Sequence, residues 1–158
     1  MLKEHQSATT LVFGAHGQLG HQLTEDLRAR GEHVVALGRT EADITDAAQV
    51  DALFAAHQPA RVFNAAAYNA VDRAEEDRDA AIAINVLGPA NLARAARAHS
   101  SLLVHFSTDY VFGNGHSAPI DESHQPEPLG AYARSKFMGE QYVRQHAPRH
   151  QIIRCCGL

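Results

Sequence analysis

The chain has 158 residues, of which 45% are hydrophobic and 20% charged, and its formal net charge is −4. This composition is typical of one globular domain and argues against a disordered, fibrous or nucleic-acid-binding protein. No apolar run approaches the roughly 20 residues that a membrane helix needs, so we expect a cytoplasmic protein that contacts neither membrane nor nucleic acid. The polar residues 1–9 are expected to form a disordered tail.

A glycine-rich turn stands between the first predicted strand, 10–13, and a predicted helix that starts at Gln18. Gly14, Gly17 and Gly20 give the spacing G-x-x-G-x-x-G, which is looser than the G-x-G-x-x-G dinucleotide fingerprint. Glycines let the backbone turn sharply and approach a ligand, and the free N–H groups at the helix start favour a pyrophosphate. The turn therefore predicts a dinucleotide site, with an ordinary glycine-rich turn as the alternative.

The second predicted strand, 33–37, leads into a turn that carries Arg39. In dinucleotide folds an acidic residue about 20 residues beyond the glycines bonds the ribose 2′-hydroxyl, whereas an arginine accommodates a 2′-phosphate. This strand end carries Arg39 and no acid, so we expect NADPH to be preferred as the cofactor, with NADH as the other possible cofactor. The alternative is a solvated turn arginine.

Strands and helices alternate through the rest of the chain. Further strands are predicted at 61–64, 102–106 and 151–155; one helix follows an N-cap at Thr45 or Asp46, one runs from Asp79 with a kink at Gly88-Pro89, and one spans 131–146. This alternation predicts a doubly wound α/β fold with a mostly parallel sheet.

The strand at 61–64 runs into the small residues Ala65, Ala66 and Ala67, followed by Tyr68. Open α/β sheets bind ligands at the carboxyl ends of their strands, so this stretch is expected to lie against the ligand. Close packing alone is the alternative reason for such small residues.

Tyr132 and Lys136 are four residues apart, which on a helix places both side chains on one face. A nearby cation favours the phenolate, so the pair suits proton transfer. Thr108 follows the strand at 102–106 and could hydrogen-bond a substrate carbonyl beside the phenol. A solvated helix pair is the alternative for an isolated Y-x-x-x-K.

The cysteines and histidines do not form a recognisable metal motif. Cys155 and Cys156 are adjacent, which matches neither a zinc site nor a redox pair, and we expect them to be buried strand residues. The 11 histidines are scattered, and the pair His146 and His150 straddles Pro148. We predict no metal site.

Several segments together resemble the extended short-chain dehydrogenases/reductases, and most closely their dTDP-4-dehydrorhamnose reductase branch. The resemblance follows the family's order and spacing over the segments 14–20, 43–46, 64–72, 85–86, 107–112 and 132–136. The string Ser-Thr-Asp-Tyr-Val-Phe at 107–112 separates this branch from sugar epimerases and dehydratases.

The resemblance implies an NAD(P)-binding Rossmann domain over 10–158, and the C-terminal substrate domain of the family is expected to be absent. It implies NADPH-dependent reduction of the 4-keto group of dTDP-4-dehydro-L-rhamnose. In that reaction Tyr132 would protonate the oxygen and Thr108 would hold it. Lys136 would bind the nicotinamide ribose and lower the pKa of Tyr132.

The same resemblance implies a set of cofactor-binding residues and a nucleotide-sugar substrate as partner. A homodimer is a further expectation from it. A non-catalytic NADP-binding regulatory subunit, like that of methionine adenosyltransferase, resembles the same branch and is the alternative. The implied cofactor-binding residues are Gly14, His16, Gly17, Gln18, Leu19, Gly20, Arg39, Asp43, Ile44, Ala65, Ala66, Ala67, Tyr68, Asn85, Tyr132 and Lys136.

Overall fold

A computed structural model describes residues 8–114 and 118–156 of the chain. Its described strands form one five-stranded sheet in the order β2-β1-β3-β4-β5, and all neighbouring strands are parallel. The predicted doubly wound α/β fold is therefore confirmed. The strands are β1 (Thr10–Phe13), β2 (Val34–Leu37), β3 (Arg61–Asn64), β4 (Leu102–Thr108) and β5 (His150–Cys155).

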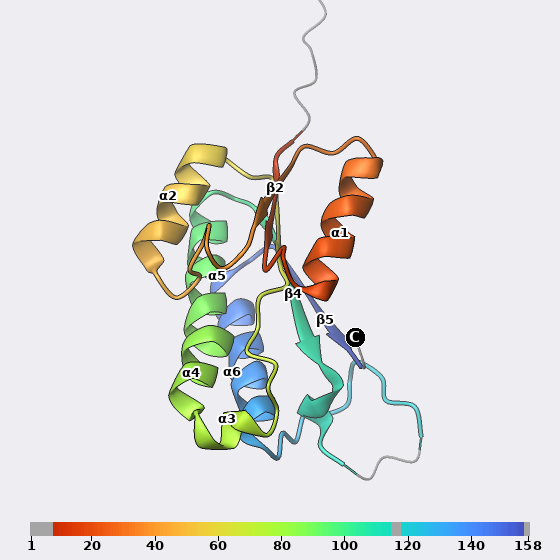
Figure 1. The fold of residues 1–158 in the computed structure, drawn as a ribbon. Helices are drawn as coiled ribbons and strands as arrows, with labels where there is room; N and C mark the ends of the chain where they lie inside the picture. Colours follow the sequence, from red (N-terminus) through yellow and green to blue (C-terminus); the bar gives the residue numbers. More distant parts are fainter. Residues whose placement is uncertain (1–7, 115–117, 157–158) are drawn as a thin grey trace, which may run out of the picture.

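Helices cover both faces of the sheet (Figure 1). The helix α1 (Gln18–Ala29) lies on one face, and α2 (Ala47–His57), α5 (Gly88–Ala98) and α6 (Ala131–His146) lie on the other. Since β2 and β3 flank β1 on opposite sides, the chain reverses its direction across the sheet after β2. Right-handed crossovers then place α1 and α2 on opposite faces.

Each face has its own hydrophobic core. The larger core joins side chains of the sheet to α2, α5 and α6, with Phe13, Phe54 and Leu92 fully buried. The smaller core joins Val12 and Leu27 under α1. Alternation along β1, with Leu11 and Phe13 facing one way and Val12 the other, follows from the two-residue period of a strand.

Local signals account for several element ends. The side chain of Asp46 caps α2 by accepting from the backbone N–H groups of Ala48 (2.9 Å) and Gln49 (3.1 Å), which selects Asp46 over Thr45 as the N-cap. Gly31, with φ +78°, follows the end of α1 in the left-handed conformation that glycine adopts readily.

The segment between β3 and α5 differs from the single kinked helix that the sequence predicted. It contains α3 (Arg73–Glu76), α4 (Arg78–Ile82) and a π-helical turn, η1 (Ala83–Leu87), which continues into α5. Pro89 has no N–H to give to the carbonyl of Asn85, where a regular α-helix would place that bond. The interrupted ladder allows the wider π turn here.

Two further expectations need correction. Thr9 was assigned to a disordered tail, but its carbonyl accepts from Ala60 N–H at 3.0 Å, so the folded part includes this residue; residues 1–7 lie outside the described part. The two cysteines were expected to be buried, yet Cys155 is only half-buried and Cys156 is exposed, because β5 ends there at the edge of the sheet. No helix in the described ranges combines the length and apolarity needed to cross a bilayer.

Candidate active site

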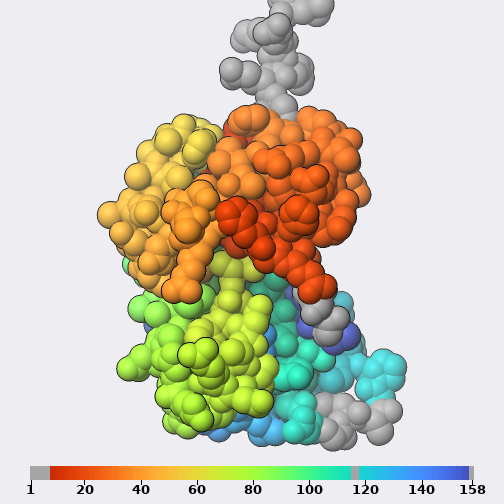
Figure 2. Space-filling model, in the orientation of Figure 1, coloured from red at the N-terminus to blue at the C-terminus, as the bar shows by residue number. Residues whose placement is uncertain are grey.

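The glycine loop joins β1 to α1 and approaches the end of β3 closely. Gly14 has φ +76°, and a Cβ atom on it would lie 2.5 Å from Ala66 N. A Cβ on Gly20 would overlap the Gly14 carbonyl, so Gly20 lets α1 pack on the loop. Gly17 is the N-cap of α1 and offers no side chain to the first-turn N–H groups, which leaves them free for a ligand oxygen. Figure 2 shows the loop, in red, at the molecular surface.

Two adjoining cavities open along the carboxyl ends of the strands, as expected for an open α/β sheet. The tyrosine cavity, of about 310 Å³, contains Tyr132, and the arginine cavity, of about 470 Å³, contains Arg39. Gly17, Ala65 and Ala67 line both, so together the cavities form one elongated site around the glycine loop. Each has a volume typical of small-molecule sites.

The arginine cavity contains several of the expected cofactor-binding residues. Its lining includes Gly14, His16, Arg39, Asp43, Ile44 and Ala66. Asp43 accepts from the hydroxyl (2.7 Å) and N–H (2.9 Å) of Thr45, and these bonds, helped by the Arg39 charge, hold the pKa of Asp43 below its usual value. The carboxylate is thereby fixed in its ionised form.

The turn after β2 also contains an acid that sequence reasoning passed over. The carboxylate of Glu41 folds back and accepts from Gly38 N–H at 2.9 Å and from the Thr40 hydroxyl at 2.8 Å. Its Oε2 lies 3.8 Å from Nδ1 of His16. The expectation that this strand end carries an arginine and no acid is therefore wrong.

The tyrosine cavity brings together the three predicted catalytic residues. Thr108 ends β4, while Tyr132 and Lys136 lie one turn apart on α6, and all three line the cavity. Burial raises the pKa of the Tyr132 phenol above its ordinary value, and a side-chain hydrogen bond with Thr108 opposes that rise. The ring of Tyr110 meets Tyr132 edge-on, with 5.9 Å between centroids.

Lys136 is 3% exposed and its ammonium donates to the Phe106 carbonyl at 2.7 Å. Burial lowers its pKa from 10.5 to about 8. The expectation that Lys136 lowers the pKa of Tyr132 is not met in this structure, where the net shift of the phenol is upward. The reason is that removal of the phenol from water raises its pKa, as do nearby Cys155, Tyr110 and Asp109, and only the hydrogen bond with Thr108 lowers it.

Three expected cofactor contacts, Tyr68, Asn85 and Gly20, line neither cavity. Asn85 is 1% exposed; its side-chain oxygen accepts from Tyr68 N–H (2.8 Å), and its amide donates to the Tyr68 carbonyl (3.2 Å) and to the Ser135 hydroxyl (3.0 Å). Ser135 in turn donates to the Tyr132 carbonyl at 2.8 Å. Asn85 thus ties the loop after β3 to the helix that carries Tyr132, and it is a positioning residue here. Gly20 is the third expected contact outside both linings.

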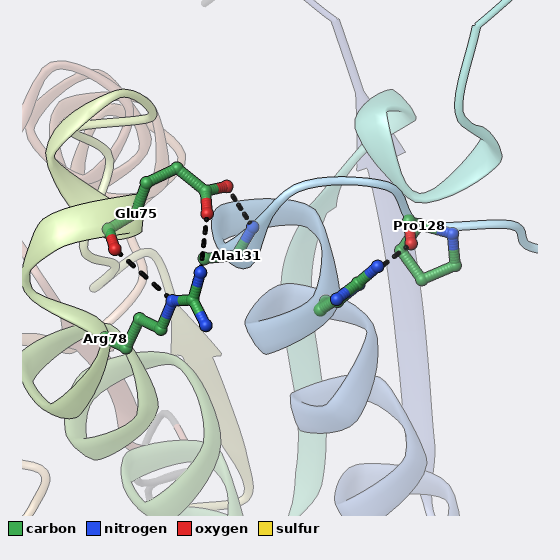
Figure 3. A network of polar contacts seen from close by, with 5 residues as sticks. Glu75, Arg78, Pro128 and Ala131 are labelled. Carbon is green, nitrogen blue, oxygen red and sulfur yellow. Dashed lines mark hydrogen bonds and ion pairs between the residues drawn. The ribbon is translucent and has the colours of Figure 1, made fainter.

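The start of α6 is held by a residue from the distant helix α3 (Figure 3). Gly130, the N-cap of α6, has no side chain, and the Glu75 carboxylate accepts from Ala131 N–H at 2.5 Å instead. Arg78 donates to the same carboxylate at 3.3 Å, and Arg134 donates to the Pro128 carbonyl at 3.4 Å. This cap lies one residue before Tyr132.

Sequence reasoning missed several cavity residues. Ser107 and Asp109 flank the predicted Thr108, and a wider window on that strand end would have included them. Nothing in the sequence pointed to Ala80, Ala83 and Ile84, which reach the arginine cavity through the irregular helical segment. Within the described ranges, no group of three or more metal-binding side chains occurs, and the prediction of a metal-free site stays a prediction.

Known proteins are similar to this chain in both sequence and fold. A dTDP-4-dehydrorhamnose reductase of Streptomyces griseus is 46% identical over 138 residues, which cover 87% of this chain and 45% of that protein. A crystal structure of dTDP-4-dehydrorhamnose reductase from Bacillus anthracis in complex with NADP superposes with a TM-score of 0.92 at 36% identity, covering 96% of this chain and 54% of that one. UDP-glucose 4-epimerase of Thermus thermophilus, in complex with NAD, has a TM-score of 0.85 at 27% identity, over 92% of this chain and 54% of its own.

The chain therefore spans about half the length of the relatives that it matches. The resemblance to the dTDP-4-dehydrorhamnose reductase branch, first drawn from short segments, is confirmed by these relatives. A family model described as the RmlD substrate binding domain matches residues 8–158, and the chain belongs to this family.

Proposed function

We propose that this chain carries the cofactor site and the proton-transfer residues of a dTDP-4-dehydrorhamnose reductase, and that the cofactor is NADPH. One observation carries the proposal. Thr108, Tyr132 and Lys136 meet in a cavity that adjoins the glycine-loop cavity, so the reactive end and the adenosine end of a dinucleotide would lie in one elongated site. A binding-only protein has no need of this catalytic triad of residues.

The residues present fit a dinucleotide. The backbone at Gly14 lies so close to Ala66 that no side chain fits there. The absence of a side chain leaves room for a pyrophosphate at the start of α1. Gln18 and Leu19 would offer their N–H groups to it, and Arg39, Asp43 and Ile44 would contact the adenosine. Lys136 would hold the nicotinamide ribose. The bound NADPH supplies the hydride for the reduction.

Tyr132 would act as the proton donor to the 4-keto oxygen of the substrate. Its raised pKa keeps the phenol protonated at neutral pH, as a donor requires. Thr108, which lines the same cavity as Tyr132, would hold the same oxygen and align it with the phenol. The names of the relatives support dTDP-4-dehydro-L-rhamnose as the substrate, reduced to dTDP-L-rhamnose.

The test follows the loss of NADPH absorbance when the purified chain meets dTDP-4-dehydro-L-rhamnose. We expect turnover with the unmodified chain and at least about 100-fold less with Tyr132→Phe, while the Kd for NADPH stays within about twofold. Tyr142→Phe, on the exposed side of the same helix, is the matched control and should keep its turnover. NADPH binding without turnover would restrict the proposal to a cofactor-binding role.

We also propose a homodimer and a cytoplasmic location. Exposed apolar side chains on the helical segment 78–98 and on α6, among them Ile82, Leu87 and Met138, support the pairing of two chains. NADPH and nucleotide sugars are charged molecules that do not cross a bilayer unaided, which supports the location. Sedimentation velocity would test the homodimer, and a monomer at micromolar concentration would contradict it. Cell fractionation would test the cytoplasmic location.

A further inference from the structure

A fully buried carboxylate lies on the face of α6 that carries Tyr132 and Lys136. Glu140 is 0% exposed, and it follows Lys136 by four residues and Tyr132 by eight, so the three side chains stand one turn apart along the helix. A buried charge is costly unless it is paired and hydrogen-bonded. The proton transfer and the cofactor contacts give Glu140 no role, so its place in the core calls for another reason.

Arg154, on the edge strand β5, supplies the charge that pairs with Glu140. Its Nε donates to one carboxylate oxygen at 2.9 Å and its terminal nitrogen to the other at 2.6 Å, which is the two-point geometry of a strong arginine–carboxylate pair. Arg144, one turn further along α6, approaches the same carboxylate at 3.6 Å from a half-exposed position. The carboxylate is thereby fixed between α6 and β5.

The guanidinium of Arg154 also contacts the segment that follows Thr108. It lies over the ring of Phe112, 4.7 Å from the centroid, where a cation is attracted to an aromatic face. Phe112 ends the 3₁₀ turn η2 (Asp109–Phe112), which begins directly after Thr108. In the sheet, Arg154 stands beside Ser107, the residue before Thr108. One buried ion pair thus joins α6, β5 and the end of β4 around the tyrosine cavity.

The charge of Glu140 acts on the ammonium of Lys136, which donates to the Phe106 carbonyl. The other titratable groups near this ammonium are His105 on β4 and Cys155 on β5. Burial, with the charge of Lys136, lowers the pKa of His105 well below its ordinary value, and burial raises the pKa of Cys155, so both are uncharged at neutral pH. Burial lowers the pKa of Lys136, and Cys155 and Glu140 oppose that fall. At neutral pH the opposing negative charge is therefore that of Glu140.

We propose that Glu140 is a positioning residue: held by Arg154, it sets the place of Lys136 at the tyrosine cavity and supplies the counter-charge of the buried ammonium. Neither Glu140 nor Arg154 is among the described residues that line this cavity, so both act through Lys136 and not on a ligand. The inference rests on the proposed function for what Lys136 does toward the cofactor, but its test needs no ligand.

The chain contains two lysines, Lys3 and Lys136, so the titration of the buried one can be followed directly. All proteins in the test carry Lys3→Arg and Cys155→Ser, which leaves one lysine to label with carbon-13 and removes the thiol that would titrate with it. NMR against pH should give a pKa of Lys136 well below 10.5. After Glu140→Gln it should fall by about one further unit, because the amide keeps the size of the carboxylate but not its charge.

A merely structural role of Glu140 predicts a shift of the opposite sign. If Glu140→Gln only loosened α6, water would reach Lys136 and its pKa would rise toward 10.5. A raised or unchanged pKa in Glu140→Gln would therefore overturn the inference. Glu25→Gln is the matched control, since it removes the same charge from an exposed position on α1 that pairs with Arg28. An equal fall in this control would also contradict a specific role of Glu140.

Because Glu140→Gln leaves Arg154 buried without its partner, a second variant combines it with Arg154→Met. A buried ion pair can often be replaced by uncharged side chains of similar volume without loss of stability. The pKa of Lys136 should still fall, since Glu140 is the member of the pair that acts on it directly. A constant or higher value would again count against the inference.

Calorimetric titration of the same proteins with NADPH tests the proposed function separately. A Lys136 pKa that falls as expected in a chain that binds no NADPH would support the inference and remove the proposed function. NADPH binding together with an unchanged pKa in both Glu140 variants would overturn the inference and leave the proposed function intact.

Discussion

Lys136 and Tyr132 share one face of α6, yet their polar groups meet different partners. The ammonium donates to the Phe106 carbonyl, whereas the phenol lies in the cavity with Thr108, whose hydroxyl donates to Asp109. Both groups are shifted toward their neutral forms by burial, the lysine downward and the tyrosine upward. In the chain without ligand, the cavity therefore disfavours charge on either residue.

The buried lysine predicts a stability that rises with pH. Its pKa is 10.5 when exposed and about 8 in the folded chain, so between these values the unfolded state binds more protons. Below pH 8 both states are protonated and the burial penalty is fully present; it is relieved as pH rises from about 8 toward 10.5. Relative to Lys136→Met, the unmodified chain should gain about 2 kcal/mol in free energy of unfolding between pH 7 and pH 10.

Urea unfolding of both proteins at the two pH values measures this difference. Both proteins carry Cys155→Ser for this comparison, because the charge of Lys136 lowers the pKa of Cys155 and the two groups would otherwise titrate together. A constant difference between them across this range would show that Lys136 is neither desolvated nor shifted in solution.

Most individual site residues could be predicted, because the residue types and their spacing along the chain indicate their chemical roles. The residues Gly14, Gly17, Thr108, Tyr132 and Lys136 all line the cavities as expected. Glu41 could not be placed, because its position depends on a turn that folds the side chain back onto Gly38. Asn85 is also expected at the ligand, but both of its amide hydrogens are donated to Tyr68 and Ser135, and its oxygen accepts from Tyr68 N–H.

At the scale of elements, the start of α6 depends on a contact that is distant in the chain. Because Gly130 cannot cap the helix, Glu75 supplies an acceptor for Ala131 N–H and a negative charge near the helix N-terminus. Glu75→Ala should therefore lower the free energy of unfolding by about 1 kcal/mol and Glu75→Gln by less. Since Tyr132 follows the cap directly, kcat should fall in Glu75→Ala while the Kd for NADPH hardly changes.

Glu76→Ala removes an exposed acid from the same short helix and serves as the control. Chemical denaturation of the three variants measures the loss of stability, and steady-state kinetics measures the change in kcat. Equal losses in Glu75→Ala and Glu76→Ala would mean that the charge of α3, and not the cap, is responsible.

The contact between α6 and the π-helical turn gives a second prediction for elements. A Cβ atom on Gly139 would overlap the carbonyl of Asn85, so the two backbones touch. Helix propensity alone favours Gly139→Ala by about 1 kcal/mol. We expect the overlap to dominate and the variant to lose about 1–3 kcal/mol of stability.

Thermal and urea unfolding of Gly139→Ala would measure the loss, with Met138→Ala at the exposed neighbouring position as the control. A stabilised Gly139→Ala would show that the helices move apart easily. The π turn itself could not be read from the sequence: Pro89 signalled an interruption, but the form of the interruption depends on how the segment packs on Gly139 and Ile44.

At the scale of the whole molecule, the proposed ligand would contact every layer of the fold. Its cavities are lined by the ends of β1, β3 and β4, the start of α1 and one face of α6. At a concentration 100 times its Kd, NADPH should stabilise the folded chain by about 2.7 kcal/mol. That corresponds to a rise in Tm of roughly 5–10 °C for a domain of this size.

Differential scanning fluorimetry with increasing NADPH would measure the rise, and 5′-AMP should give a smaller one. A Tm that does not depend on NADPH would contradict a cofactor site in these cavities. The parallel sheet itself was predictable, because strand-like and helix-like segments alternate with short connections. Its strand order was not, since hydrophobic pattern does not say on which side of β1 a strand is added.

That strand order also bears on how the protein is assembled during synthesis. The first two strands pair with each other, and β3 then adds to the free side of β1; β4 and β5 follow, each on the edge that the preceding strand has just formed. No strand has to be inserted between two that are already paired. A nascent chain can thus extend the sheet in the order in which it leaves the ribosome, with each crossover helix covering the newest strand before the next one arrives.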